Sequence, residues 1–348
     1  MKILINQLGR IGDLILITPI FQLLKKNFPD AEIYVICGDK NYNAIIDDIN
    51  LENIFVYHKN IIGYFKLLFK LKKIEFDYYF DPKDHNSSES NILSKIIKAK
   101  VKIGNKSDKN KFDVDINQIR DKSDLHFTSV AVAGAKYIIN KCLNSKVKID
   151  RIPKPNLYLN ENSENYTKTF LENNNLDSFI LINISASNSN KMWLKYRWID
   201  FIEFLINNKY INESNKLIIC SAPKEKNEAE EIINVIKSKG LKSYSHFNQN
   251  ELIYFSSRSI NDIFSIVSKS KLLISPDTSL VHIAAAFDIP IFGLYSGNEI
   301  FYDKFRPTFN QEIEVKSAII RAKNGDDGIH SINLKQVIEA FETINTKL

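Results

Sequence analysis

Two short loops carry the side chains that are best placed to do chemistry. The first, Gly9-Arg10-Ile11-Gly12-Asp13, directly follows the apolar run Lys2–Asn6, and its two glycines allow the backbone to turn sharply and approach a ligand. Because the turn opens a predicted helix, its free amides can bind an anion. The Asp13 carboxylate could take a proton from a substrate or could simply cap the helix, and spacing alone leaves both interpretations open. A third glycine is missing, so the full dinucleotide fingerprint is excluded.

The second loop, residues 275–279, also joins a predicted strand to a predicted helix. Thr278 and Ser279 offer hydroxyls and backbone amides at a helix N-terminus, where a diphosphate is stabilised. The alternative is a helix cap, with Asp277 or Thr278 as the capping residue. His282 lies about one turn into this helix and would share a face with Thr278 or Ser279, although a single helical histidine is more often structural.

Two further loops follow predicted strands in the C-terminal half. Lys191 lies in a polar loop that includes Ser185, and a lysine beside a phosphate site acts as a point-charge clamp. Glu225 could accept hydrogen bonds from ribose hydroxyls. An ordinary solvated lysine and a first-turn helix glutamate are the simpler alternatives. Since each of the four loops follows a strand, together they indicate an α/β protein that binds a phosphorylated ligand.

Strand-like and helix-like runs alternate along the chain, which implies parallel sheets covered by helices. In the N-terminal half we expect strands at Lys2–Asn6, Glu32–Cys37, Ile54–Tyr57 and Phe76–Phe80, and helices at Asp13–Asn27 and Asn41–Ile49. In the C-terminal half we expect strands at Phe179–Asn183, Lys216–Cys220, Lys271–Ser275 and Ile289–Leu294, and helices at Trp198–Asn207, Glu225–Ser238, Ile260–Ser268, Ser279–Phe287 and Ser331–Asn345. Pro153 and Pro155 interrupt the pattern and indicate a linker. Two such domains facing each other would form one cleft between the carboxyl ends of their strands.

Composition narrows the class of protein. The chain has 348 residues, 44% of them apolar, and a net charge of +6, which suits two globular domains. No basic-aromatic module is present, so we expect no nucleic-acid partner. The three cysteines, Cys37, Cys142 and Cys220, are too far apart for a disulfide framework or a metal site and fit a reducing compartment. No apolar run is long enough to span a membrane and the N-terminal run is a poor signal peptide, so we expect a cytoplasmic protein whose membrane contact is peripheral.

Residues 59–111 are unusually basic. They contain 13 lysines and 6 acidic residues, an excess of +7. Within them, Ile61–Lys73 mixes apolar residues with lysines, as in a basic amphipathic helix that lies on an anionic membrane surface. The alternative is a helix that packs its apolar side into the domain and leaves its lysines in water. Lys66 and Lys70 of this stretch, with Arg10, are our candidates for acceptor binding.

The motifs together resemble glycosyltransferase family 9, the ADP-heptose:lipopolysaccharide heptosyltransferases. The resemblance covers nearly the whole chain. It is carried by Gly12-Asp13-Leu14 with Thr18-Pro19, by Lys191-x-Trp193 followed by Trp198, by Ala222-Pro223-Lys224-Glu225, and by residues 277–286 with Pro290 and Gly293. Ser279 departs from the pattern, since the family usually has glycine there, and a side chain at this position narrows the approach to phosphate.

The resemblance implies a GT-B fold, with an acceptor-binding Rossmann-like domain at 1–155, a donor-binding Rossmann-like domain at 156–330, and a helix at 331–348 that packs back on the N-terminal domain. It implies inverting, metal-independent transfer of a heptose from ADP-heptose to a lipopolysaccharide-core or other lipid-linked envelope acceptor, with no cofactor.

The resemblance also assigns roles to the site residues. Asp13 corresponds to the general base and Lys191 to the diphosphate ligand, with Gly12, Ser185, Glu225, Asp277, Thr278, Ser279 and His282 as donor-binding residues. The alternative function is a sugar-nucleotide-binding protein or epimerase of the same fold without transferase activity.

Overall fold

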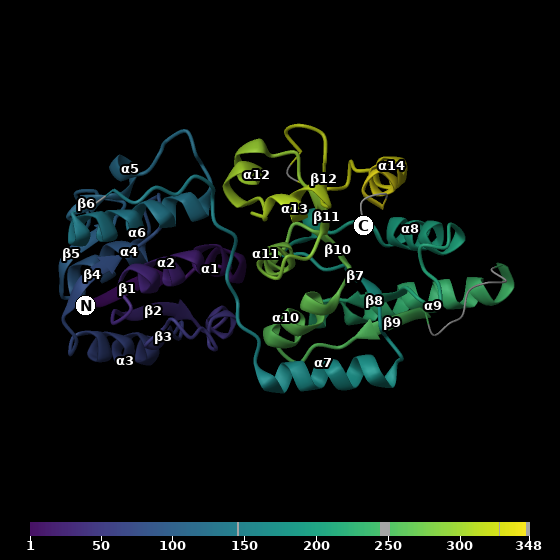
Figure 1. The fold of residues 1–348 in the computed structure, drawn as a ribbon, viewed down its shortest axis with the longest axis horizontal. Coiled ribbons are helices and arrows are strands. Elements are labelled where there is room, and N and C mark those ends of the chain that lie inside the picture. Colours follow the sequence, from purple (N-terminus) through teal and green to yellow (C-terminus); the bar gives the residue numbers. More distant parts are fainter. Residues whose placement is uncertain (145, 244–250, 327, 346–348) are drawn as a thin grey trace. The chain divides into compact units, whose positions relative to one another are not determined.

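The chain folds into two compact α/β units. The computed structural model describes residues 1–144, 146–243, 251–326 and 328–345. The first unit comprises Met1–Tyr158 and Asp303–Arg306, and the second comprises Leu159–Tyr302 and the chain from Pro307 onward. Each unit is built on its own parallel six-stranded sheet in the described residues (Figure 1). The predicted pair of Rossmann-like α/β domains is therefore confirmed.

The first unit has the strand order β3-β2-β1-β4-β5-β6. Its strands are β1 (Lys2–Gln7), β2 (Glu32–Gly38), β3 (Asn53–Tyr57), β4 (Phe76–Phe80), β5 (Ala99–Gly104) and β6 (Val114–Asp115). Its helices are α1 (Ile11–Ile17), α2 (Pro19–Asn27), α3 (Ile61–Leu71), α4 (Ser88–Ile96), α5 (Ile116–Ile119) and α6 (Phe127–Leu143), with a 3-10 turn, η1, at Tyr42–Ala44. All strand pairs are parallel, so the loops after β1, β2, β3 and β4 meet at one edge of the sheet.

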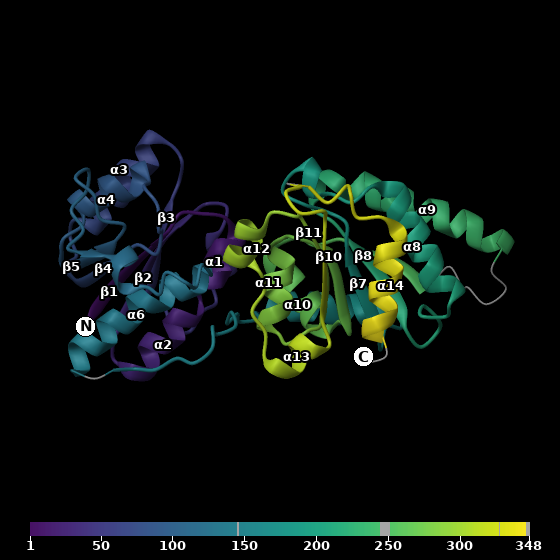
Figure 2. The same ribbon diagram turned by 90° about the horizontal axis from the view of Figure 1, so that it is seen from above.

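Helices cover both faces of this sheet, with α3 and α4 on one face and α1, α2 and α6 on the other (Figure 2). The central strands β1 and β2 are buried over almost their whole length, as expected for parallel strands covered on both sides. On the α3–α4 face, Leu67, Leu68 and Leu71 of α3 and Leu93 and Ile97 next to them share one apolar cluster with strand residues. Burial of this cluster fixes which side of α3 faces inward.

The second unit has the strand order β12-β11-β10-β7-β8-β9. Its strands are β7 (Phe179–Asn183), β8 (Lys216–Cys220), β9 (Leu252–Phe255), β10 (Leu272–Pro276), β11 (Ile291–Tyr295) and β12 (Ala318–Arg321). Its helices are α7 (Glu161–Asn173), α8 (Lys195–Asn207), α9 (Lys226–Ser243), α10 (Ile260–Lys269), α11 (Ser279–Ala286), α12 (Glu299–Phe305), α13 (Gln311–Val315) and α14 (Leu334–Asn345), with 3-10 turns η2 (Ser189–Lys191) and η3 (Pro223–Glu225). The last residues of α12 belong to the first unit.

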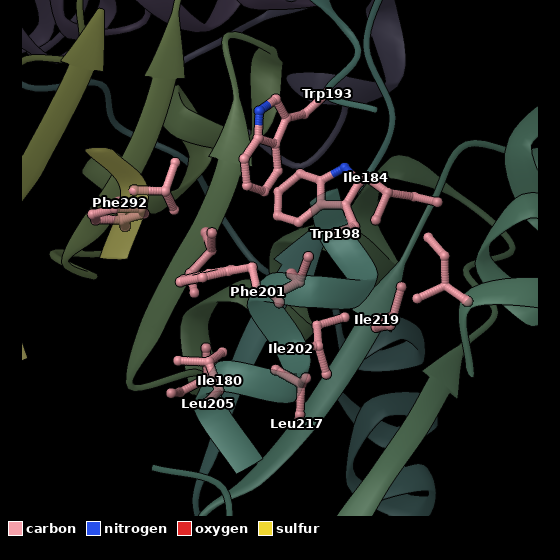
Figure 3. Close-up of a cluster of buried hydrophobic side chains, with 14 of the residues drawn as sticks. Ile180, Ile184, Trp193, Trp198, Phe201, Ile202, Leu205, Leu217, Ile219 and Phe292 are labelled. Atoms are coloured by element: carbon pink, nitrogen blue, oxygen red, sulfur yellow. The ribbon is translucent and has the colours of Figure 1, made fainter. Parts of the chain in front are cut away.

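An aromatic cluster anchors one face of the second sheet. Figure 3 shows Trp193, Trp198, Phe201 and Phe292 among buried isoleucines and leucines from β7, β8 and α8. The two indole rings meet edge to face at 4.9 Å, and Trp193 Nε1 donates to the Ile332 carbonyl at 2.9 Å. The loop that precedes α8 is therefore held by two large buried side chains, Trp193 within the loop and Trp198 near the start of the helix.

The sequence predicted most of the strands to within about two residues, but two helices differ from the expectation. The predicted helix Asp13–Asn27 is two helices, because Pro19 has no amide hydrogen and a new helix starts at it after Thr18. The predicted helix Asn41–Ile49 is only the turn Tyr42–Ala44, and the Ile49 side chain is exposed. The apolar residues of this stretch are spaced as they would be in a helix, but only some of their side chains are buried in the domain.

The first unit ends close to the expected boundary and also includes a short segment from far along the chain. The first unit runs three residues past 155, to Tyr158, and takes in Asp303–Arg306, where Lys304 Nζ donates to both carboxylate oxygens of Asp84 at 2.9 Å. The C-terminal helix α14 belongs to the second unit. It lies against α8 and β12, because its apolar stripe, which includes Val337 and Phe341, completes the core of the second unit. No helix of the described residues is long and apolar enough to cross a membrane.

Candidate functional site

The carboxyl ends of β7 and β10 are tied together by one buried amide. Asn183, the last residue of β7, donates from Nδ2 to the Ser185 carbonyl at 3.0 Å, to Ser275 Oγ at 3.0 Å and to Thr278 Oγ1 at 3.3 Å. Its Oδ1 accepts from the Ser185 amide at 3.1 Å. An amide can act as donor and acceptor at once without bringing a charge into the core. Asn183 therefore sets the spacing between the two loops that hold the predicted site residues.

Lys191 forms a buried ion pair across this edge. Its Nζ lies 2.5 Å from Asp277 Oδ2, and both side chains are about nine-tenths buried. The same Nζ stands 3.9 Å from the centre of the Phe301 ring, a cation–π contact. An isolated buried charge would be costly, so pairing with a carboxylate and an aromatic face is what keeps the ammonium in this position. The anchored Trp193, two residues later, fixes the chain that carries it.

Glu225 and Ser185 form the second contact group at this edge. Ser185 Oγ accepts from the Ala222 amide at 2.7 Å and lies 3.3 Å from Glu225 Oε2. The other carboxylate oxygen of Glu225 pairs with Lys224 Nζ at 2.9 Å, and the Glu225 side chain is buried. The loops after β7 and β8 are thus joined through a hydroxyl, with a carboxylate held between them that can accept hydrogen bonds from a hydroxylated ligand.

The loop after β10 opens helix α11 in the way that the sequence indicates. Thr278 is the N-cap, and its hydroxyl accepts from the Leu280 amide at 3.3 Å. Ser279 is the first helical residue and is half-buried, and His282 is buried one turn further on. Asp277 is not the cap, because its carboxylate is engaged with Lys191. The first amides of α11 and the Lys191 ammonium both favour negative charge at this edge.

Asp13 lies at the corresponding edge of the first sheet, in the first turn of α1. Its Oδ2 accepts from the Arg10 amide at 3.1 Å. A side-chain carbon on Gly9 would stand 2.7 Å from that oxygen, so a larger residue there would displace the Asp13 carboxylate. Burial raises the pKa of the Asp13 carboxyl above its ordinary value, and the Arg10 amide and the positive charges of Arg10, Lys83 and His85 partly oppose this rise. A carboxylate with a raised pKa is a stronger base than an exposed one.

The loop after β4 brings the cations Lys83 and His85 toward Asp13. It is anchored by Asp81, which accepts from Asn6 Nδ2 at 2.7 Å and from the Lys83 amide at 3.1 Å. On the other side, Asn41 donates to the carbonyls of Gln7 and Gly9 at 3.1 and 3.0 Å. Buried side-chain amides thus fix the loops on both flanks of the Asp13 turn.

Comparison with known proteins identifies the family of this chain. The model of glycosyltransferase family 9 (heptosyltransferase) matches residues 64–324. The chain belongs to this family. It is 25% identical over 297 residues to the lipopolysaccharide core heptosyltransferase OpsX of Haemophilus influenzae, an alignment that covers 84% of this chain and 78% of OpsX.

Solved structures share the fold. A family 9 glycosyltransferase from Veillonella parvula superposes with a TM-score of 0.76 at 16% identity, covering 100% of this chain and 98% of that one. The ADP-heptose lipopolysaccharide heptosyltransferase II of E. coli superposes with a TM-score of 0.73 at 17% identity, covering 100% and 99%. The protein therefore has the GT-B fold and is a glycosyltransferase of family 9. The alternative of a binding protein or epimerase without transferase activity is set aside.

The second unit gathers most of the predicted site residues of this glycosyltransferase. Asn183 connects Ser185, and through it Glu225, to Thr278, and Lys191 pairs with Asp277, which directly precedes Thr278 in the chain. Gly12, also predicted to bind the donor, instead lies in α1 of the first unit beside Asp13.

Two predicted acceptor residues lie apart from the Asp13 turn. Lys66 and Lys70 stand on the exposed side of α3, one and two turns beyond its start. The third candidate, Arg10, lies beside Asp13, and its charge lowers the pKa of the Asp13 carboxyl, as do those of Lys83 and His85. The sequence analysis did not single out Lys83 or His85, and their position directly after the strand Phe76–Phe80 is the signal that could have found them.

Removing the Asn183 amide is expected to destabilise the second unit. Asn183→Ala leaves the Ser275 and Thr278 hydroxyls without their buried donor, which costs about 1–3 kcal/mol of unfolding free energy. Chemical denaturation followed by Trp193 and Trp198 fluorescence measures it. Asn208→Ala is the matched control, because that exposed asparagine makes only a local bond within α8 to the Phe204 carbonyl. Equal stability of the two variants would show that the amide does not hold the loops.

Proposed function

We propose that this family 9 glycosyltransferase transfers a heptose from ADP-heptose to an acceptor of the lipopolysaccharide core or a related envelope glycan. The observation that carries the proposal is the buried Lys191–Asp277 pair beside the amide end of α11. The amide end of α11 favours the negative charge of a diphosphate, and the N–H groups of Lys191 that do not bond to Asp277 can donate to it. The names of two similar proteins support the substrates, since OpsX is a lipopolysaccharide core heptosyltransferase and the E. coli enzyme is named an ADP-heptose lipopolysaccharide heptosyltransferase.

In the proposed donor complex each residue has one task. Lys191 binds the diphosphate, because an ammonium has three N–H donors and the bond to Asp277 uses one of them. The backbone amides of Ser279 and its neighbours, at the start of α11, further stabilise the bound diphosphate. Glu225 accepts hydrogen bonds from the ribose hydroxyls, and Ser185 holds its carboxylate in place.

The proposed reaction is a single displacement with inversion. An acceptor hydroxyl oxygen attacks the anomeric carbon of the heptose and forms the new glycosidic bond, while Asp13 takes the hydroxyl proton. The bond from that carbon to the diphosphate breaks, and its electron pair leaves with the diphosphate. Lys191 and the α11 amides stabilise the charge that grows there, so we propose that the reaction needs no metal ion.

We further propose that the enzyme works in the cytoplasm, on the inner face of the cytoplasmic membrane. Its three cysteines are free thiols, two of them buried, which suits a reducing compartment. Burial raises the pKa of Cys37 and of Cys220, so both thiols stay protonated and inert.

Nucleotide binding should distinguish the donor. Calorimetry is expected to show binding of ADP and weaker binding of UDP and GDP. Lys191→Gln should weaken ADP binding about 10- to 100-fold, since a charge-assisted hydrogen bond is lost. The exposed Lys195, which pairs with Glu231, supplies the control variant Lys195→Gln.

Loss of Lys191 also leaves Asp277 buried and unpaired, so the double variant Lys191→Gln/Asp277→Asn tests binding without that penalty. Tight UDP binding without ADP binding would refute the proposed base.

Asp13→Asn should abolish transfer and spare donor binding. The amide keeps the shape of the carboxylate and its contact with the Arg10 amide but cannot accept the proton, which typically costs ~10²–10⁴-fold in kcat. Asp39→Asn, an exposed residue in the turn after β2, is the control. Near-normal turnover of the Asp13 variant would show that this residue acts only as a helix cap.

The pH profile should depend on Lys83. Because the Lys83 charge lowers the pKa of Asp13, Lys83→Gln should raise that pKa, and the base form then appears only at higher pH. The acid limb of kcat/KM is therefore expected to move to higher pH, whereas exposed Lys59→Gln should leave it in place. An unchanged limb in the Lys83 variant, or a shift to lower pH, contradicts the assignment of this limb to Asp13.

A further inference from the structure

Helix α3 exposes apolar side chains that the sequence pattern would place in a core. Ile62 is 69% exposed, and Phe65 and Phe69 are each 64% exposed. They follow one another at i, i+3 and i+7, so they form one stripe along the helix. The opposite side, with Leu67, Leu68 and Leu71, is buried against the sheet. The outward stripe therefore lies outside the buried cluster, although the Phe65 ring meets the Tyr64 ring edge to face.

Lysines flank this stripe on both sides. At 100° per residue, Lys72 lies on one side of Phe65, and Lys73, Lys66 and Lys70 follow Ile62 on the other. All four lysines are exposed, and Lys73 Nζ stands 4.2 Å from the centre of the Phe69 ring. The helix Ile61–Leu71 itself contains no acidic residue. Aromatic rings bordered by long cationic side chains are the composition of a helix that lies at a bilayer surface.

Helix α4 continues the same surface. It covers the same face of the first sheet as α3, and the two share one buried cluster (Figure 2). Its outward side adds Ile92, 45% exposed, with Lys95 and, just after the helix, Lys98. Glu89 is the one exposed acidic residue of α4. We call the outward sides of these two helices the α3–α4 face.

We infer that the α3–α4 face binds an anionic lipid bilayer, with Phe65, Phe69 and Ile62 at the boundary between headgroups and acyl chains. The lysines would lie at the level of the anionic headgroups, where each strengthens binding about fivefold. The inference goes beyond the proposed reaction and does not depend on it, because lipid binding is measured without donor or acceptor.

The position of α3 connects this surface to the chemistry. The helix begins right after β3 ends at Tyr57, so its first turn stands at the carboxyl edge of the first sheet, where the Asp13 turn also lies. A bilayer held against α3 is then close to the edge that carries Asp13. An acceptor whose lipid stays in the membrane would present its sugar to that edge without leaving the bilayer.

The test is co-sedimentation of the full chain with vesicles of phosphatidylcholine alone or mixed equally with phosphatidylglycerol. Binding is expected only to the anionic vesicles and should weaken strongly at about 0.5 M salt, where surface charges are screened. Replacing Lys66, Lys70, Lys72 and Lys73 by Gln should lower the partition coefficient about a hundredfold or more. Replacing Lys168, Lys226, Lys316 and Lys335 of the second unit by Gln is the charge-matched control and should change it little.

The apolar stripe has its own variants. Phe65→Ser/Phe69→Ser should reduce binding at least about tenfold, whereas Ile49→Ser/Val315→Ser, at exposed sites off this face, should not. In Phe65→Trp, the added indole should shift its emission to the blue on anionic vesicles only, since Trp193 and Trp198 are already buried. Thermal melting and ADP binding check that each variant is folded.

Three results would overturn the inference. One is the absence of binding to anionic vesicles at low salt. Another is an equal loss of vesicle binding in the α3 variants and in the control variants. The third is a dimer in analytical ultracentrifugation that Phe65→Ser/Phe69→Ser dissociates, since that would assign the stripe to a second copy of the chain.

Discussion

The ion pair between Lys191 and Asp277 is the contact on which the organisation of the second unit's site depends. Two opposite charges, each about nine-tenths buried, are costly to remove from water, and their attraction offsets that cost only in a well-fixed geometry. The structure supplies this geometry from three sides, through the Phe301 ring beneath the ammonium, the anchored Trp193 and the Thr278 cap of α11. A pair of this kind is poor as a source of stability, which favours a role in binding.

The pair also fixes the position of the Lys191 side chain. The Asp277 carboxylate and the Phe301 ring hold its ammonium at the carboxyl edge of the sheet. In the proposed function, a diphosphate would meet an ammonium that is already ordered, so less side-chain entropy would be lost on binding. The charge that develops in the proposed transition state would meet the same fixed group, which is what electrostatic preorganisation requires.

Buried asparagines perform the corresponding task for the backbone in both units. Asn183 joins the loops after β7 and β10, and Asn41 holds the Gly9 loop through the carbonyls of Gln7 and Gly9. Each satisfies loop backbone groups that have no partner in a sheet or helix, and such groups are expensive to bury unpaired. Neutral amides thus position these loops without adding charge beside the candidate site residues.

The sequence predicted the framework of the fold because parallel strands buried on both faces appear as continuous apolar runs, as in Phe179–Asn183 and Lys216–Cys220. It also located the residues with unusual chemistry next to those strands, and Asp277 and Glu225 lie where expected. It could not identify the roles of Asn183 and Asn41, because an asparagine at a strand end or in a loop is common and its bonds depend on which distant loop lies beside it. The break at Pro19 was missed for a different reason. The proline is itself a signal for a new helix start, but the helical spacing of apolar residues in 13–27 continues through it.

Helix α3 marks the limit of what an amphipathic pattern can say. Periodicity indicates that Ile61–Lys73 has apolar residues on more than one side, but it does not say which of them the domain covers. The structure decides this, because Leu67, Leu68 and Leu71 fill the space above the sheet and leave no room there for Phe65 and Phe69. The core-packing interpretation is confirmed for these three leucines, and binding to a membrane surface stays a proposal for the exposed residues. A helix that only served the core would gain nothing from two exposed phenylalanines, which lower solubility. Their presence beside four lysines is accounted for if the domain meets a surface that is apolar and anionic at once, and an acceptor anchored in such a surface would place that requirement on any enzyme that modifies it.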